Sequence, residues 1–288
     1  MELTIEGILQ KIETTSIPKI KKCAIAYSGG LDSTLGIELL RRVYKAEEII
    51  AINVDVGQGE EEMQLGITRA QKLKLDPIII DAKEEFTEEW LKKAILANSD
   101  YCGYPVSTSM TRQLIGKLVA KKAVELGCDS ILEGSTGRGN DQYRMHNVIK
   151  MFAPEVEILA PVRDFDLTRK EELMLCSHWG VPVEEFIVGG DDKTMWCRSI
   201  ASGAVDLNQA IPDEIWMWLT PPEQAPDQPE FVELTFEEGV PVALNGQALK
   251  LGELIPRLNT IAGRNGIGLI DIFEDGIMDL KSREIYEA

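Results

Sequence analysis

A short stretch from Ser28 to Thr34 combines the residue types that hold a phosphate group. It has the sequence SGGLDST and lies between an apolar run, CAIAY (23–27), and a helical run (33–45). Its two glycines let the backbone approach an anion closely, and its three hydroxyl groups can donate hydrogen bonds. The helix that follows adds free amides and the positive end of its dipole. The stretch has no lysine, which a Walker-type phosphate loop needs, so it predicts a phosphate site of another kind.

The loop resembles the SGGxDS pyrophosphate loop of the N-type ATP pyrophosphatases. Those enzymes cleave ATP between its α and β phosphates, adenylate a substrate oxygen and release pyrophosphate. The aspartate of the loop, Asp32, would repel a bare phosphate, so we expect a divalent cation, Mg²⁺, beside it. An ordinary Gly-Gly turn capped by serine is the alternative. The position of the match, between a strand and a helix, favours the nucleotide loop.

The elements around this loop predict an α/β fold. Five apolar runs are predicted strands, and helical stretches separate them. This alternation predicts a twisted parallel sheet with helices on both faces and a ligand at the carboxyl ends of the strands. A short amphipathic helix is expected before the first strand, at residues 4–15. The predicted strands are 23–27, 49–56, 77–82, 129–135 and 157–162.

The pattern changes after about residue 165 and predicts a second, smaller α+β domain. We therefore expect a nucleotide-binding ATP pyrophosphatase domain at 1–165, including the N-terminal helix, and a shortened synthetase domain at 166–288. The elements expected in the second domain are a helix at 168–179, a hairpin that turns at Asn245-Gly246, a helix at 250–263 and a hairpin-like segment at 267–286.

Composition restricts the class of partner. The 288 residues are 44% hydrophobic and 27% charged, and the net charge of −18 would repel a polyphosphate backbone. The five cysteines are scattered without a CxxC pair, which is typical of a reducing compartment. The sequence shows no apolar leader and no segment long enough to cross a bilayer. We expect a soluble cytoplasmic protein that binds neither nucleic acid nor membrane.

Further stretches narrow the family. They are DVGQGEE (55–61), YPVSTSMTR (104–112), EGSTGRGNDQYR (133–144), GVPVALNG (239–246), IAGRNGIGLIDIFED (261–275) and KSREIYEA (281–288). Together they resemble argininosuccinate synthase, over roughly residues 22–288. The resemblance implies an AMP-forming carbon–nitrogen ligase of arginine biosynthesis. In that family, the ureido oxygen of citrulline attacks the α-phosphate of ATP, and the amine of aspartate then displaces AMP.

The resemblance also assigns residues to ligands. Those assigned to ATP are Ala26, Tyr27, Ser28, Gly29, Gly30, Asp32, Ser33, Thr34, Val54 and Gly134. Those assigned to citrulline and aspartate are Tyr104, Thr108, Ser109, Arg112, Thr136, Asn140, Asp141, Arg144, Ser199, Glu274 and Tyr286. The predicted catalytic residues are Asp32, Ser33 and Asp141, and Asp32 is the predicted Mg²⁺ ligand.

The residue types fit these roles. Thr136 lies in a glycine-rich turn whose amides can receive a carboxylate, and Arg144 offers a planar fork for one. Asn140 and Arg144 are one helical turn apart, so both can face one pocket. Asp141 can pair with the ammonium group of the substrate aspartate, and Glu274 with that of citrulline.

Several local predictions come from the residues alone. We expect Ser107 to cap a helix that starts at Thr108, with Arg112 on the same face as Thr108. Apart from the resemblance, Ser199 is expected to be an ordinary loop serine, and Tyr286 a packing residue or part of a frayed end. The two histidines, His146 and His178, are expected to be structural or at the surface.

The sequence departs from the family pattern at four points. The loop ends in Asp-Ser-Thr where the family has Asp-Thr-Ser, and Glu133 replaces a histidine before Gly134. Gly190 stands where a serine touching citrulline is expected. The sequence stops at KSREIYEA, where family members continue into a C-terminal oligomerisation helix, so the expected homo-oligomer is a dimer.

Two alternatives stay open at this stage. In tRNA thiouridylases, which share the pyrophosphate loop, two separated cysteines carry sulfur to an adenylated base. Cys102 and Cys197 could be such a pair, in a sulfur transferase that acts on tRNA or on a small molecule. The other alternative is a degenerate ATP-binding subunit that needs a partner.

Overall fold

The structure of the chain is a computed structural model. It describes residues 3–137, 139–181, 191–200, 209–212, 215–275 and 281–288. Two compact units are present, and each is described by itself. The first unit comprises 1–55, 60–80 and 112–187, and the second comprises 56–59, 81–111 and 188–288. The domain division at residue 165 stays a prediction.

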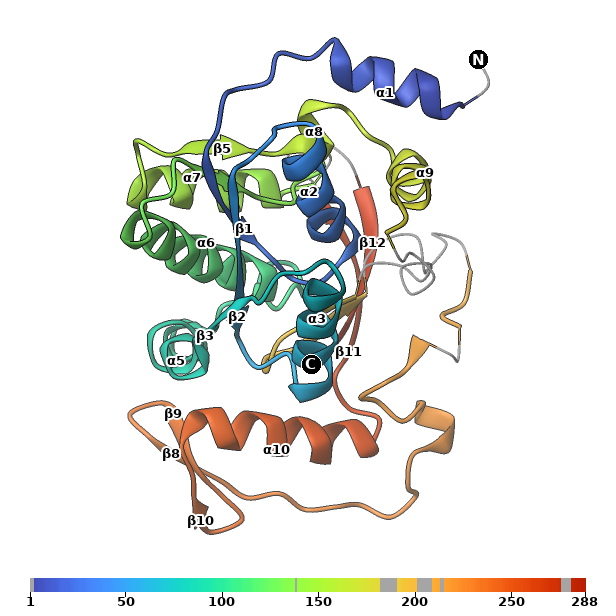
Figure 1. The fold of residues 1–288 in the computed structure, drawn as a ribbon. Helices are drawn as coiled ribbons and strands as arrows, with labels where there is room; N and C mark the ends of the chain where they lie inside the picture. The colour runs from blue at the N-terminus through green and yellow to red at the C-terminus, as the bar shows by residue number, and fades with distance from the viewer. Residues whose placement is uncertain (1–2, 138, 182–190, 201–208, 213–214, 276–280) are drawn as a thin grey trace. The chain divides into compact units, whose positions relative to one another are not determined.

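The first unit is built on a five-stranded parallel sheet, which confirms the predicted α/β class (Figure 1). Its strands have the order β3-β2-β1-β4-β5. They are β1 (Lys22–Ala26), β2 (Glu48–Asp55), β3 (Ile78–Asp81), β4 (Ser130–Leu132) and β5 (Glu157–Leu159). Ile25 of β1 lies opposite Leu132 of β4 in parallel register. The loops that follow these two strands therefore begin side by side at the same edge of the sheet.

Helices cover both faces of this sheet (Figure 1). α2 (Leu31–Arg42) and α3 (Glu60–Lys72) lie on one face, with α6 (Ser107–Glu125) and α7 (Asp141–Phe152) on the other. The remaining helices of the unit are α1 (Ile5–Glu13), α8 (Pro161–Asp164) and α9 (Arg169–Trp179). None of the helices within the described ranges is long and apolar enough to cross a membrane.

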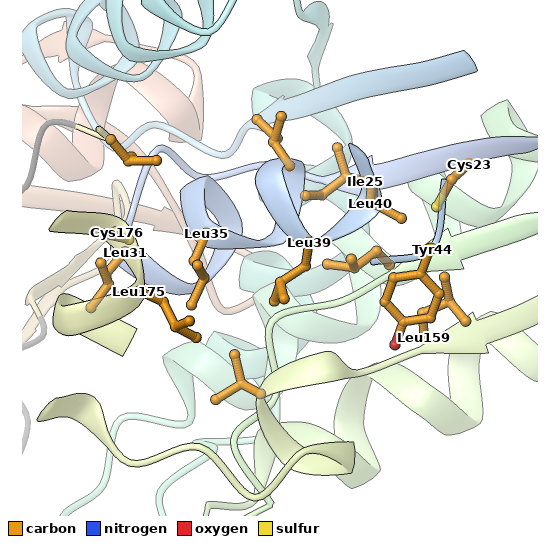
Figure 2. Close-up of a cluster of buried hydrophobic side chains, with 14 of the residues drawn as sticks. Cys23, Ile25, Leu31, Leu35, Leu39, Leu40, Tyr44, Leu159, Leu175 and Cys176 are labelled. Carbon is orange, nitrogen blue, oxygen red and sulfur yellow. The ribbon is translucent and has the colours of Figure 1, made fainter. Parts of the chain in front are cut away.

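The core of the first unit lies between α2, the sheet and α9 (Figure 2). Leu35 and Leu39 of α2 are fully buried, as are Leu175 and Cys176 of α9. Gly36 lets α2 pack directly on the strands, because a Cβ at that position would lie 3.0 Å from a methyl group of Leu132. The helix that carries the glycine-rich loop is thus fixed along its length by apolar packing.

The helix predicted at residues 4–15 forms as α1. Thr4 caps it by accepting a hydrogen bond from the amide of Gly7 at 3.2 Å. Ile8 and Ile12 are buried on one face of the helix, as the amphipathic pattern predicts. Lys11, on α1, forms a salt bridge of 3.5 Å with Glu171 of α9.

The second unit contains two antiparallel sheets and one long helix. Strand order in the larger sheet is β11-β12-β7-β6, and in the smaller sheet it is β10-β9-β8. The larger sheet consists of β6 (Asp191–Lys193), β7 (Arg198–Ile200), β11 (Leu269–Asp275) and β12 (Lys281–Glu287). The smaller sheet consists of β8 (Leu234–Glu237), β9 (Val240–Leu244) and β10 (Gln247–Ala248), and α10 (Leu251–Arg264) follows it.

The hairpins predicted in this unit are confirmed. Asn245 and Gly246 join β9 to β10 with φ angles of 49° and 76°, as a two-residue turn of type I′ requires. β11 and β12 pair in antiparallel register along seven residue pairs. The helical segments before residue 101 are α4 (Lys83–Glu85), a π-helical stretch (Phe86–Leu91) and α5 (Lys92–Leu96).

Two helix starts differ from the prediction. α2 begins at Leu31 rather than at residue 33, since Gly30 is its N-cap. α6 begins at Ser107, so Ser107 is the first helical residue and does not cap the helix. The hydroxyl group of Ser107 instead contacts that of Thr194 at 3.2 Å, which is a tertiary contact that local sequence patterns do not reveal.

A buried carboxylate holds the end of the second unit together. Glu287 is fully buried, and its Oε2 accepts a hydrogen bond from Arg198 at 2.5 Å. Its Oε1 accepts from the backbone amides of Met217, Trp218 and Leu219 at 2.9–3.0 Å. One side chain thereby joins strand β12, strand β7 and the segment around residue 218.

We expect Glu287→Gln to lower the free energy of unfolding by about 3 kcal/mol, because it leaves the Arg198 guanidinium buried without its counter-charge. Urea denaturation measures this loss. Glu237→Gln is the matched control, since Glu237 is exposed on β8, and it should change stability by less than about 0.5 kcal/mol. Equal effects of the two substitutions would show that the buried pair is not an anchor.

Candidate functional site

The glycine-rich loop joins β1 to α2 and is held by its own hydroxyl groups. Gly29 has a φ of 81°, in the left-handed region that favours glycine. Ser28 Oγ accepts from the amide of Gly30 at 3.3 Å and lies 3.3 Å from Ser33 Oγ. Ser33 Oγ in turn donates to the carbonyl of Gly30 at 3.1 Å. The first turn of α2 and the loop therefore form one rigid structure whose helix amides can face an anion.

Helix α3 supports the loop from outside. A Cβ on Gly29 would lie 2.7 Å from the Cα of Gly66, so the two backbones are in direct contact. Arg69, one turn further along α3, donates from Nη1 to the carbonyl of Gly29 at 2.9 Å. Neither Gly66 nor Arg69 could be predicted as a loop contact from the sequence, because nothing in their spacing points to the loop.

Asp32 lies in the first turn of α2 and has a cationic neighbour from the chain itself. Nη1 of Arg169, the first residue of α9, lies 3.2 Å from Asp32 Oδ1. Both side chains are partly exposed, so this ion pair adds little stability. It does place a guanidinium beside the loop, which partly offsets the negative charge of Asp32.

The other residues assigned to ATP surround the same loop. Tyr27 and Thr34 are 2% exposed, and within the described part of the chain their hydroxyl groups have no hydrogen-bond partner. Burial raises the pKa of the Tyr27 hydroxyl. Gly134 follows β4, and a Cβ there would lie 3.6 Å from Cβ of Asp32. The two remaining residues lie at the ends of neighbouring strands, Ala26 in β1 and Val54 in β2.

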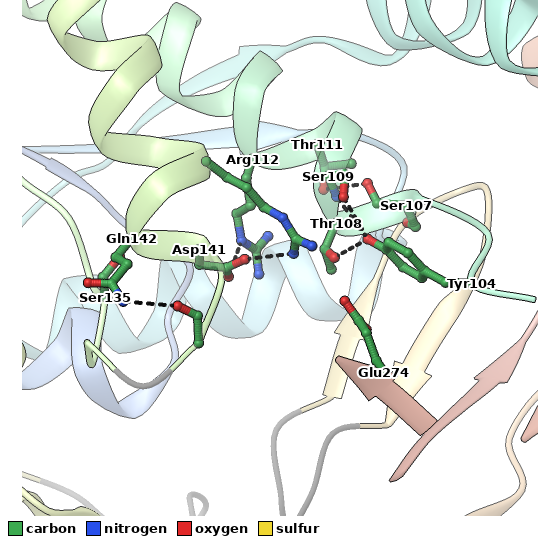
Figure 3. Close-up of polar contacts among 12 residues, drawn as sticks. Tyr104, Ser107, Thr108, Ser109, Thr111, Arg112, Ser135, Asp141, Gln142 and Glu274 are labelled. Atoms are coloured by element: carbon green, nitrogen blue, oxygen red, sulfur yellow. Dashed lines mark hydrogen bonds and ion pairs between the residues drawn. The ribbon is translucent and has the colours of Figure 1, made fainter. Parts of the chain in front are cut away.

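A second polar cluster in the first unit is centred on Asp141 (Figure 3). Asp141 Oδ2 accepts from Nε of Arg112 at 2.8 Å, and Oδ1 accepts from Nη1 of Arg144 at 3.1 Å. Burial alone would raise the pKa of Asp141, but the two guanidinium groups outweigh it and hold the pKa below its ordinary value. The side chain predicted to pair with an ammonium group is thus an anion held between two cations.

The turn before α7 carries the other residues assigned to aspartate. Thr136 is exposed in this turn, and Asn140 immediately precedes α7. Gly137 has a φ of 78°, and its carbonyl accepts from Nε2 of Gln142 at 3.0 Å. The turn, Asn140 and Asp141 therefore follow one another along the chain at the start of α7.

The second unit brings together a group of residues assigned to citrulline (Figure 3). The hydroxyl of Tyr104 accepts from the amide of Ser109 at 2.9 Å and contacts the hydroxyl groups of Thr108 and Ser109. The Tyr104 ring packs against Tyr286, with ring centroids 5.5 Å apart. Both tyrosines are 2% exposed. The first turn of α6 is thereby fixed to strand β12.

Tyr286 connects this group to two further assigned residues. Its hydroxyl donates to Glu274 Oε2 on β11 at 3.0 Å, and it lies opposite Ser199 of β7 in the sheet register. Burial raises the pKa of the Tyr286 hydroxyl. The loop position expected for Ser199 was wrong, since Ser199 is the central residue of a buried strand. Gly190, where a serine was expected, lies outside the described residues.

The two cysteines of the sulfur-transfer alternative differ in environment. Cys102 is exposed, whereas Cys197 is 1% exposed between Tyr104 and Tyr286. Burial raises the pKa of the Cys197 thiol to about 12. Thiolates are the reactive form of cysteine, so Cys197 is poorly suited to carry sulfur. The described residues contain no group of three His, Cys, Asp or Glu side chains placed to hold a metal ion.

The parallel sheet and the loop after β1 define an α/β nucleotide-binding protein. A family model, the arginosuccinate synthase N-terminal HUP domain, matches residues 22–182. The model of the arginosuccinate synthase C-terminal domain matches residues 190–288. The chain therefore belongs to the argininosuccinate synthase family.

Curated relatives agree with this assignment. Argininosuccinate synthase from Methanococcus maripaludis is 44% identical, over 93% of this chain and 68% of the relative. The enzyme from Methanopyrus kandleri is 41% identical, over 93% of this chain and 69% of the relative. The enzyme from Methanocaldococcus jannaschii is 43% identical, over 92% of this chain and 67% of the relative. These relatives do not favour the sulfur-transfer or degenerate-subunit alternatives.

One solved structure also shows a likeness. The U34-tRNA thiolase NcsA of Methanococcus maripaludis is 20% identical with a TM-score of 0.43, over 63% of this chain and 66% of that chain. At this level the likeness supports no inference about function.

We expect Gly29→Ala to lower the free energy of unfolding by about 3 kcal/mol, because it adds a steric conflict with α3 to the cost of a positive φ. Gly127→Ala is the matched control: Gly127 also has a positive φ, of 67°, but nothing lies within 4 Å of its added Cβ. It should cost about 1 kcal/mol. Denaturation curves for the two variants test this, and equal losses would contradict the contact between Gly29 and Gly66.

Proposed function

We propose that this chain is an argininosuccinate synthase, which joins citrulline to aspartate at the expense of ATP. The ureido oxygen of citrulline attacks the α-phosphate of ATP, and the bond between the α and β phosphates breaks. Pyrophosphate leaves, and citrullyl-AMP is formed. The amine of aspartate then attacks the ureido carbon and displaces AMP, which gives argininosuccinate. The observation that carries the proposal is the loop after β1, whose amides, hydroxyl groups and rigid support suit a leaving pyrophosphate.

The loop residues have distinct roles in this scheme. Gly29 and Gly30 bring backbone amides to the β and γ phosphates, while Ser28, Ser33 and Thr34 supply hydroxyl donors. Such donors are already in position before the reaction, so they stabilise the developing charge without reorganising. Ala26, Tyr27, Val54 and Gly134 bind the rest of the nucleotide.

The loop residues also fit Mg²⁺, the ion that the family pattern implies. Mg²⁺ is usually held by one or two carboxylates together with substrate phosphates. Asp32 supplies one carboxylate at the mouth of the loop, and the described residues include no larger cluster that would hold a metal alone. We assign Asp32 as its protein ligand. When bound, the ion neutralises charge on the phosphates.

The polar cluster around Asp141 suits the substrate aspartate. Arg112 and Arg144 can hold its carboxylates, and the amides near Thr136 and Asn140 can receive one of them. Asp141, kept ionised by the same two arginines, attracts the ammonium group of the substrate. Asn140 and Arg144 also face citrulline in this proposal.

The cluster in the second unit suits citrulline. Glu274 would pair with the α-ammonium group of citrulline, and the hydroxyl groups of Ser109 and Ser199 would hold its polar atoms. Tyr104, Thr108 and Tyr286 would complete the contacts and keep them in place. We further propose that the protein is cytoplasmic and forms a homo-oligomer, with a dimer as the expected state.

The reaction itself tests the proposal. With ATP, Mg²⁺, citrulline and aspartate, we expect AMP, pyrophosphate and argininosuccinate in equal amounts by mass spectrometry. We expect Asp32→Asn to slow AMP formation by about 100-fold, because it removes the charge that holds the metal beside the phosphates.

The control for this substitution is Asp76→Asn, since Asp76 is exposed in the same unit, and it should leave the rate within about twofold. If AMP forms without argininosuccinate, the adenylation step stands, but the second substrate is another amine or sulfide instead of aspartate. Unchanged AMP formation by Asp32→Asn would remove the loop from the mechanism.

A further inference from the structure

Glu133 is a buried acid that the proposed mechanism does not use. It immediately follows β4, and its side chain is 1% exposed. Its Oε2 accepts from the amide of Ser135 at 3.1 Å and also from the Ser135 hydroxyl. Its Oε1 is buried without a hydrogen-bond partner in the portion of the chain that the structure describes. A buried polar atom in this state is costly and usually has a role.

The position of Glu133 connects it to two parts of the site. Its own amide donates to the carbonyl of Leu159 at 2.9 Å, so its backbone is fixed to β5. Gly134, the next residue, lies beside Asp32 of the nucleotide loop. The side chain of Glu133 folds back on Ser135 and closes the turn that leads to Thr136. A change in the hydrogen bonds of Glu133 would therefore alter the position of Thr136, because only Gly134 and Ser135 separate the two residues.

The surroundings of Glu133 bring its pKa close to neutral pH, where the ionised and the protonated carboxyl are both populated. Burial raises the pKa of Glu133 to about 7, and the negative charge of Asp141 on α7 adds to this rise. The two hydrogen bonds from Ser135 and the positive charge of Arg163 on α8 act in the opposite direction and lower the pKa. Asp32 on α2 also lies near this turn, since its Cβ would be 3.6 Å from a Cβ on Gly134, and it is paired with Arg169. The ionised form accepts stronger, charge-assisted hydrogen bonds than the neutral form.

We propose that Glu133 is a positioning residue for the substrate aspartate, which acts by holding Ser135 and thereby the turn that presents Thr136. This inference rests on the proposed function, because it takes Thr136 to bind aspartate. The ionised carboxylate holds the turn firmly, and protonation weakens that hold. Affinity for aspartate should therefore be full above the pKa of Glu133 and should fall as the pH drops through it.

Kinetics as a function of pH test this role. For the wild-type enzyme, we expect the KM for aspartate to rise about tenfold from pH 8 to pH 6, the difference between a charge-assisted and a neutral hydrogen bond. Glu133→Gln cannot ionise, so its KM for aspartate should be flat with pH and close to the wild-type value at pH 6. The KM for citrulline should be the same in both enzymes, which a general loss of structure would not produce.

Two further variants make the test specific. His146 on α7 is another group that can titrate near neutral pH, and burial lowers its pKa. His146→Gln should keep the wild-type pH dependence. Ser135→Ala removes one donor to Glu133 while the buried carboxyl stays, and it should raise the KM for aspartate and flatten its pH dependence even if Glu133→Gln folds poorly.

The outcomes separate this inference from the proposed function. If Thr136→Ala raises the KM for aspartate but Glu133→Gln keeps the wild-type pH dependence, the role of Glu133 is overturned and the aspartate site stands. If the pH dependence disappears in His146→Gln, the titrating group is His146 and the inference fails. If Thr136→Ala leaves the KM for aspartate unchanged, the proposed aspartate site is wrong, and the role of Glu133 is overturned with it.

Discussion

The parallel pairing of β1 with β4 is the constraint on which the first unit depends. Because Ile25 and Leu132 lie opposite each other, the chain leaves both strands at one edge of the sheet. One exit becomes the glycine-rich loop, and the other becomes the turn from Glu133 to Asn140. Crossover helices are needed to bring parallel strands into this register. Helices α2 and α7, which follow β1 and β4 along the chain, begin at that edge.

The strongly negative charge of the chain makes local cations important. With a net charge of −18, the general field around the protein repels anionic substrates. Four arginines offset this field near the site: Arg69 and Arg169 at the loop, and Arg112 and Arg144 around Asp141. Each is tied to a fixed acceptor, so its charge stays at a defined point. The positive charge near the loop and near Asp141 thus depends on the placement of a few side chains, while the sum of the charges is negative.

Much of the first unit could be predicted from the sequence, because its signals are local. All five strands were found from apolar runs, and the loop from glycine and hydroxyl spacing. The hairpin at Asn245-Gly246 was equally clear, since its turn demands positive φ angles. Contacts between distant segments could not be predicted. Ser199 lies in a strand because β12 and β6 pair with β7 on its two sides, and Arg169 meets Asp32 from 137 residues away.

The placement of α9 connects the N-terminal helix to the nucleotide loop. α1 lies outside both family models, yet Lys11 pairs with Glu171 in the first turn of α9. Arg169, which faces Asp32, is the first residue of that same turn. Two ion pairs, Lys11 with Glu171 and Arg169 with Asp32, therefore connect the segment before the first strand to the first turn of the helix that follows the nucleotide loop.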